Sequence, residues 1–235
     1  MSGEVGKWGS GGVTIVTIAM AVAMVAGGGA TQARQSIGDW VSLFDGQTIS
    51  EWRGFNQTEV PSGWTVVDEA MTRTGDGVDL ITRDQYASFE FAFEWKVPPG
   101  GNSGVMFHVT EGLPRTHHSG PEYQVLDNAL HADGKNPLTS AGADYALHAP
   151  TRDASRPVGE WNEGRLLVNG SHVEHWLNGE KVVEYEWGTP EWTTLVAGSK
   201  FKEWPTFGQQ ATGHIALQDH GDRVAFRNLR IRVIS

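Results

Sequence analysis

Two Asn-Gly dipeptides, Asn169-Gly170 and Asn178-Gly179, constrain the fold of this chain more than any other feature. Asn and Gly accept the positive φ angles that a two-residue type I′ hairpin turn requires. The dipeptides lie a strand's length apart, and the segments around them, 165–168, 172–177 and 181–187, are short and largely apolar or aromatic. The sequence therefore predicts a three-stranded antiparallel meander, with a type I′ turn at each dipeptide.

A period of two predicts another strand at 88–97, where large aromatic residues from Phe89 to Trp95 alternate with small or charged ones. A short helix or a loop is expected at 192–207, and no segment shows sustained helical periodicity. Many short strands separated by turn residues favour an all-β sandwich or jelly roll of two antiparallel sheets. Further strands are expected at 40–44, 64–67, 78–82, 213–218 and 224–233.

The N-terminus has the outline of an export signal. An uncharged apolar run from Val13 to Ala26 is too short for a comfortable membrane span, follows Lys7 and precedes small residues at 27–33. We expect residues 1–33 to be a signal peptide and leader, with an uncleaved N-terminal anchor as the alternative. The mature protein would be exported to the periplasm or extracellular space, without a stable membrane span, as a single domain over 39–235.

The composition argues against some partners and favours others. A formal net charge of -10 and a pI near 5.3 argue against nucleic acid, which binds basic surfaces. The chain has no Cys, so disulfides and lipid attachment through Cys are excluded. Ten Trp favour carbohydrate, because indole faces stack on sugar rings. We therefore expect an oligosaccharide or a glycoside as the partner.

Polar side chains gather on two predicted strands between Gly100 and Asn128. Asn102 and His108 have the same parity on the first strand, so both are expected to emerge on one face, and Glu122 shares its face with Gln124 on the second. The segment Gln218-Asp219-His220-Gly221 ends another predicted strand far downstream. These groups can act as acids, bases, metal ligands or hydrogen-bond partners of a sugar, and we expect them to meet in one cleft.

Six motifs occur in order along the chain, and together they resemble the 3-keto-disaccharide hydrolase family over essentially everything after the predicted signal. The resemblance implies a concanavalin A-like jelly roll. It also implies an activity, the cleavage of glycosides whose sugar carries a ketone at C3. The motifs are Leu43-Phe44-Asp45-Gly46 with Trp52, Gly101-Asn102-Ser103-Gly104-Val105, Pro121-Glu122-Tyr123-Gln124-Val125-Leu126-Asp127, Gly159-Glu160-Trp161-Asn162, Trp176-Leu177-Asn178-Gly179 and Gln218-Asp219-His220-Gly221.

The implied reaction is an elimination followed by a hydration. A C3 ketone acidifies the hydrogen on C2, a base removes it, the enolate expels the group on C1, and water adds to the resulting enone. The route needs one base, a group that stabilises the enolate and an acid near the leaving oxygen. A divalent metal ion bound to the ketone could provide the stabilisation as a Lewis acid.

On this hypothesis Glu122 or His220 is the base, and Asp219 orients the imidazole of His220. His108 is the candidate metal ligand, with an ordinary strand histidine as the alternative. Other candidates also have a structural interpretation, since Trp95 could belong to the core and Lys202 could be surface charge. The candidates for substrate binding by hydrogen bonds, stacking or charge are Asn102, Gln124, Gln218, Trp95, Tyr145, Trp161 and Lys202.

Two other functions compete with this hypothesis. A non-catalytic, lectin-like carbohydrate-binding module would use the same fold, although it has little need for Glu, Asp and His in one place. A glycosidase acting on unoxidised sugar would need a pair of carboxylates such as Glu122 and Asp127. Those two residues have opposite parity on their strand, which argues against the pair.

Overall fold

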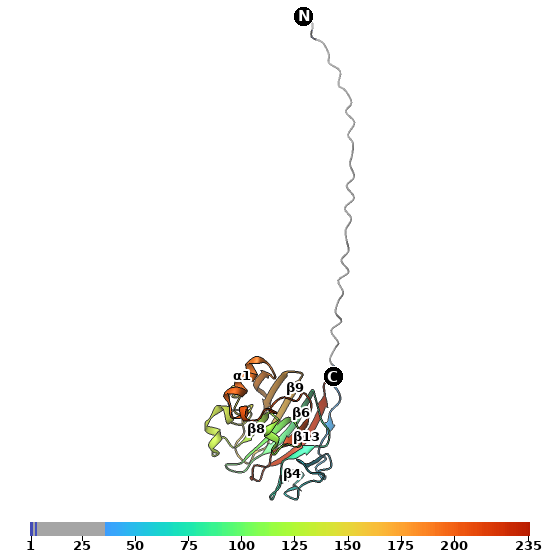
Figure 1. Cartoon of the computed structure of the whole chain (residues 1–235), viewed down its shortest axis with the longest axis vertical. Helices are drawn as coiled ribbons and strands as arrows, with labels where there is room; N and C mark the ends of the chain where they lie inside the picture. The colour runs from blue at the N-terminus through green and yellow to red at the C-terminus, as the bar shows by residue number, and fades with distance from the viewer. Residues whose placement is uncertain (2, 4–35) are drawn as a thin grey trace. The chain divides into compact units, whose positions relative to one another are not determined.

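The computed structural model describes residues 1, 3 and 36–235 (Figure 1). The predicted signal peptide and leader lie outside the described residues, apart from residues 1 and 3. Among the described residues, no helix is long and apolar enough to cross a membrane.

Residues 36–235 are built on two antiparallel sheets, as the sequence predicts. The larger has the order β11-β10-β9-β6-β13-β4-β3, with β1 also paired to β13, and the smaller has the order β2-β5-β12-β7-β8. The larger sheet contains β1 (Val41–Ser42), β3 (Trp64–Val67), β4 (Ala70–Arg73), β6 (Phe89–Lys96), β9 (Asn162–Asn169), β10 (His172–Leu177), β11 (Glu180–Glu186) and β13 (Ala225–Val233). The smaller sheet contains β2 (Trp52–Gly54), β5 (Leu80–Thr82), β7 (Asn102–Val109), β8 (Glu122–Leu126) and β12 (His214–Leu217).

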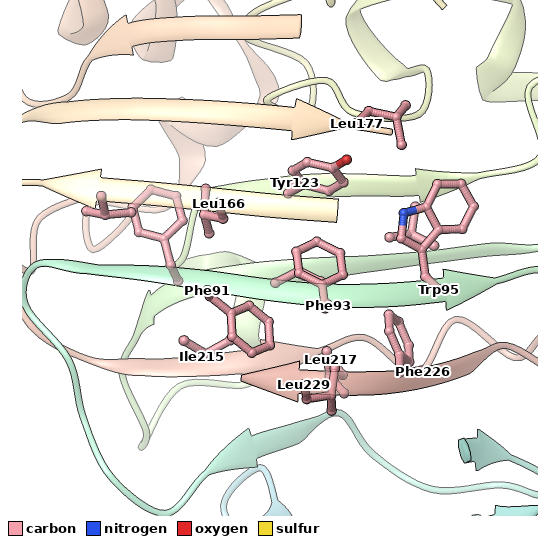
Figure 2. Packing of buried hydrophobic residues seen from close by; sticks show 14 of the residues in the cluster. Phe91, Phe93, Trp95, Tyr123, Leu166, Leu177, Ile215, Leu217, Phe226 and Leu229 are labelled. Carbon is pink, nitrogen blue, oxygen red and sulfur yellow. The ribbon is translucent and has the colours of Figure 1, made fainter. Parts of the chain in front are cut away.

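The hydrophobic core lies between the two sheets. Phe91 and Phe93 of β6 are buried and stack with their ring centroids 5.2 Å apart, and Phe93 meets Tyr123 of the smaller sheet edge-on at 5.3 Å. Figure 2 shows these aromatic rings packed beside Ile215 and Leu217. Burying one such side chain stabilises the fold by about 1.5–3 kcal/mol relative to leaving it exposed. The alternation in β6 therefore fixes which face of the larger sheet is inside.

The predicted meander is present, but its first turn differs from the prediction. Asn178 and Gly179 both have positive φ, 50° and 84°, which is the type I′ pattern. In the first turn Asn169 already pairs with His172, so the two-residue loop is Gly170-Ser171 and not Asn169-Gly170. Gly170 has a φ of 60° at the first loop position, which is typical of a type II′ turn. The type I′ prediction for Asn169-Gly170 is therefore wrong.

The loops cover the outer face of the smaller sheet. The segment 142–145 lies along the edge of β8, where the Tyr145 amide donates to the Glu122 carbonyl at 2.9 Å and the Gln124 amide donates to the Ala143 carbonyl at 3.1 Å. The short helical elements lie in the loops between strands, and Figure 1 labels α1 beside β9. They are η1 (Thr116–His118), η2 (Ala132–Lys135), η3 (Pro137–Thr139), α1 (Pro190–Gly198) and η4 (Lys200–Glu203).

Candidate active site

A cavity of about 130 Å³ opens on the outer face of the smaller sheet. It brings together the two polar strands and the downstream motif, although Asn102 and His220 are 118 residues apart in the chain. Six of its eight lining residues were candidates from the sequence, and His117 and Lys200 are additions. The lining residues are Asn102, His117, Glu122, Gln124, Tyr145, Lys200, Gln218 and His220.

Strand parity and one glycine place Glu122 in this cavity. Glu122 and Gln124 project outward from β8 because Tyr123, between them, points into the core. Gly104 lies opposite on β7, where its register partner is Gln124. A Cβ atom at position 104 would overlap the Glu122 carboxylate, so any larger residue there would displace that side chain. The Gly-Asn-Ser-Gly motif thus provides both Asn102 and the space for Glu122.

The Glu122 carboxyl is a buried acid without a hydrogen bond from any described residue. Only 6% of the surface of Glu122 is exposed to solvent. Burial raises the pKa of Glu122 to about 8, and the nearby carboxylates of Asp79, Asp144 and Asp133 add to the rise, while Lys200 opposes it. A group with this pKa can exchange a proton near neutral pH.

Lys200 supplies a cation to the same cavity. Ser199 caps the turn η4 by accepting the Phe201 amide at 3.1 Å, and Lys200 follows this cap directly. The Lys200 Nζ lies 4.2 Å from the centre of the Tyr145 ring. Burial lowers the pKa of Lys200, whereas the carboxylates of Glu122 and Asp133 favour its charged form. The cavity therefore holds a carboxyl group and an amine that are electrostatically coupled.

Two buried amide oxygens in the cavity wall have no partner among the described residues. Gln124 donates from Nε2 to the Thr139 carbonyl at 3.2 Å, and its Oε1 is left unpaired. Asn102 Oδ1 is likewise buried and unpaired. Buried acceptors without partners are costly. Both oxygens are thus available to accept hydrogen bonds from the hydroxyl groups of a bound ligand.

Three imidazoles lie at the cavity or beside it. Asn102 Nδ2 is 3.5 Å from His220 Nε2 and 3.4 Å from His131 Nε2, so one amide links the two rings. His131 Nδ1 accepts the Asp133 amide at 3.1 Å, which fixes the ring at the start of η2. Burial, and then the neighbouring His118 and Lys200, lower the pKa of His117 to about 4, so this ring is neutral at physiological pH.

Besides His108, four of the candidate residues do not line the cavity. Asp219 binds Arg73 Nε through Oδ1 at 2.7 Å and accepts the Gly221 amide at 3.0 Å, so its hydrogen bonds hold the loop to β4 and do not orient His220. Trp95 is 1% exposed in the core. Trp161 lies on the larger sheet under Arg227, and Lys202 points into solvent. The expectation that Asp219 orients the His220 imidazole has no supporting hydrogen bond.

The expected orientation of His108 is wrong, because a β-bulge reverses the parity of β7. His214 pairs with Val109 and Ala216 pairs with Met106, so β7 has one residue more than its partner. His108 absorbs the extra residue with a φ of 52°. Its ring is buried, Nε2 contacts the Ala87 carbonyl at 2.8 Å, and burial lowers its pKa. His108 therefore does not reach the cavity.

The cavity does not form a preassembled metal site. Among the described residues, the only group of His and carboxylate side chains close enough to share an ion is His172, Glu174 and Glu184, on β10 and β11. These three could hold a metal, but they do not line the cavity.

Sequence reasoning missed three residues at the site. His117 lies in a loop without periodicity, and only the fold brings it beside β8. His131 is recognisable as a helix cap only once η2 is known. The Lys200-Phe201-Lys202 stretch offered two cations, and Ser199 as a potential N-cap was the one signal that could have singled out Lys200.

The chain is similar to a known protein family, to one relative of known activity and to solved crystal structures. Residues 39–232 match the model of the 3-keto-alpha-glucoside-1,2-lyase-like domain. A 3-keto-disaccharide hydrolase of Bacteroides thetaiotaomicron is 36% identical over 227 residues, covering 83% of this chain and 78% of the relative. A crystal structure of a proposed glycosyl hydrolase from Parabacteroides distasonis has a TM-score of 0.79 and 32% identity, covering 84% of this chain and 94% of that one. A second crystal structure from the same organism has a TM-score of 0.65 and 29% identity. The match covers 83% of this chain and 99% of that one.

Proposed function

Because the chain belongs to the 3-keto-alpha-glucoside-1,2-lyase-like family, we propose that it cleaves 3-keto-glycosides by elimination and hydration. The relatives support a glycoside hydrolase. The cavity supports the particular route, because it contains a raised-pKa carboxyl, a cation and imidazoles in place of two spaced carboxylates. Its volume is below the roughly 300 Å³ of sites for drug-sized ligands, which suits a single sugar ring.

Glu122 is the proposed base. Its ionised carboxylate takes the C2 proton of the bound 3-keto sugar, and the electrons of the C–H bond form the enolate between C2 and the C3 oxygen. A carboxylate with a pKa of about 8 is a stronger base than an ordinary one. This buried carboxyl without a hydrogen-bond partner is the observation that carries the proposal, since its raised pKa suits a group that exchanges a proton with the substrate.

Lys200 is the proposed stabiliser of the enolate. Its ammonium lines the same cavity and can approach the oxygen that becomes negative in the transition state. A preorganised cation in a partly desolvated site is most effective where charge develops. Gln124 Oε1 and Asn102 Oδ1 would accept sugar hydroxyls and hold the ring so that C2 faces Glu122.

His220 is the proposed acid and hydration partner. As the enolate collapses, the C1–O bond breaks, and the leaving oxygen takes a proton from the imidazole. Water then adds to C1 of the enone, giving one proton back to His220, while Glu122, after exchanging its proton with solvent, delivers a proton to C2. The sum is hydrolysis of the glycosidic bond without net oxidation or reduction.

The proposal is tested by following a 3-keto-disaccharide in deuterated water. Elimination and hydration incorporate solvent deuterium at C2 of the released 3-keto monosaccharide, whereas direct hydrolysis leaves the C2 hydrogen in place. Incubating the product without enzyme corrects for spontaneous exchange next to the ketone. Glu122→Gln should abolish turnover, and Glu59→Gln, at an exposed site, should retain it. Release of product without C2 deuterium would overturn the route.

A further inference from the structure

The outer face of the larger sheet contains a trough on the opposite side of the core from the proposed active site. Three cavities of about 630, 420 and 390 Å³ make it up. The first and second share Ser42, Phe44 and Asn228 in their walls, and the second and third share Arg227, so the three adjoin one another. We call this row of adjoining cavities the outer trough. It is several times larger than the cavity around Glu122.

A β-bulge forms the middle of the outer trough. The pairing of β13 with β6 shifts between Arg227 and Arg230, and Asn228 takes a φ of 53° at this point. Bulges bend a strand and redirect its side chains. Here two side chains of the bulge bind the Glu94 carboxylate. Asn228 Nδ2 donates to Glu94 Oε1 at 2.6 Å, and Arg227 Nε donates to Glu94 Oε2 at 2.7 Å. The polar groups of the floor are therefore held in fixed positions.

Three indoles are distributed along the outer trough. Trp176 and Trp40 line the first cavity, and Trp161 lines the third. A guanidinium group lies over each ring. The distance from its central carbon to the ring centre is 3.9 Å for Arg165 and Trp176, 4.7 Å for Arg232 and Trp40, and 4.1 Å for Arg227 and Trp161. Trp40 is 37% exposed. Aromatic rings that are already oriented lose little entropy when they contact a ligand.

The charge of the outer trough is balanced, although the chain as a whole is acidic. Five carboxylates and five cationic side chains line the three cavities, whereas the chain has a formal net charge of -10. A balanced surface gives no preference for an anionic polymer. The indoles and the fixed hydrogen-bonding groups offer apolar surfaces and polar partners, which are the two kinds of contact that neutral sugar rings make.

We propose that the outer trough binds an extended chain of neutral sugar residues, separately from the active site. Its volume, its three indoles and its balanced charge fit a polysaccharide, whereas the small cavity on the opposite face fits one ring. Such a surface would keep the protein on a glycan that contains its substrate. The proposal does not depend on the reaction proposed for Glu122.

The test is affinity electrophoresis of the full chain in native gels that contain dextran, hydroxyethyl cellulose, galactomannan or xyloglucan. We expect retardation by at least one polymer. Trp40→Ala and Trp161→Ala should each weaken the apparent Kd roughly tenfold, the loss typical of an aromatic anchor. Trp40→Phe retains an aromatic ring and should retain binding. Thermal melting of each variant verifies that it is folded.

Glu122→Gln is the control that separates the two sites, and it should be retarded like the wild-type protein. Loss of retardation in this variant would assign the binding to the small cavity and overturn the proposal. Equal retardation of wild type and both alanine variants, or no retardation by any of the four polymers, would also overturn it.

Discussion

The buried Glu122 should destabilise the folded protein at alkaline pH, and Glu122→Gln should remove this effect. The carboxyl has a pKa of about 8 when folded, against a reference value of 4.5. The folded state therefore holds the proton more tightly than the unfolded chain does. Its contribution to stability is fully present below pH 4.5 and is lost as the pH rises through about 8. Glutamine keeps the shape of the side chain and does not ionise.

The size of the effect follows from the pKa difference. Each pKa unit corresponds to about 1.4 kcal/mol, so the rise to about 8 gives at most about 5 kcal/mol. Urea unfolding of wild type and Glu122→Gln at pH 4.5, 6, 7.5 and 9 measures it. The free energy of unfolding of the variant minus that of wild type should increase steadily over this series. A difference that stays constant within roughly 0.5 kcal/mol would refute the assignment of a raised pKa.

Three further predictions concern catalysis and packing. Lys200→Met should lower kcat/KM for a 3-keto-glycoside by roughly 10²–10³-fold, and Lys202→Met, from the same turn, should have little effect; equal losses would remove the special role of Lys200. The kcat/KM of the wild type should rise with pH through about 8, because the base must be ionised, and a fall over that range would make Glu122 the acid. Phe93→Ala should cost about 3–5 kcal/mol in urea unfolding, because Phe93 is buried between Phe91 and Tyr123; a loss under about 1 kcal/mol would contradict the packing.

Much of the fold could be predicted from the sequence because its strands follow local rules. Alternation in β6 defines the buried face, and the Asn178-Gly179 turn defines a hairpin. The same parity placed Glu122 and Gln124 side by side in one cavity. Local rules failed where one extra residue enters a strand, since the bulge at His108 turns that side chain away from the face that parity assigns to it.

The rest of the site depends on contacts between distant segments, which no local pattern encodes. Lys200 comes close to Glu122 only because the segment after α1 folds back over the smaller sheet. Asp219 has the chemistry of an imidazole partner, yet Arg73, which is far away in sequence, binds it. Trp161 and Trp95 are equally aromatic, and only the packing of the sheets places one on the outer face and the other in the core.

The proposed reaction requires a ketone at C3 of the sugar, so the choice between oxidised and unoxidised substrate distinguishes it from ordinary glycoside hydrolysis. The most direct measurement incubates the protein with a 3-keto-disaccharide and, separately, with the unoxidised parent disaccharide, and quantifies the monosaccharides released. We expect release of the 3-keto monosaccharide from the first and no cleavage of the second, because only the ketone acidifies the C2 hydrogen. Equal cleavage of both, or cleavage of the parent alone, would contradict it.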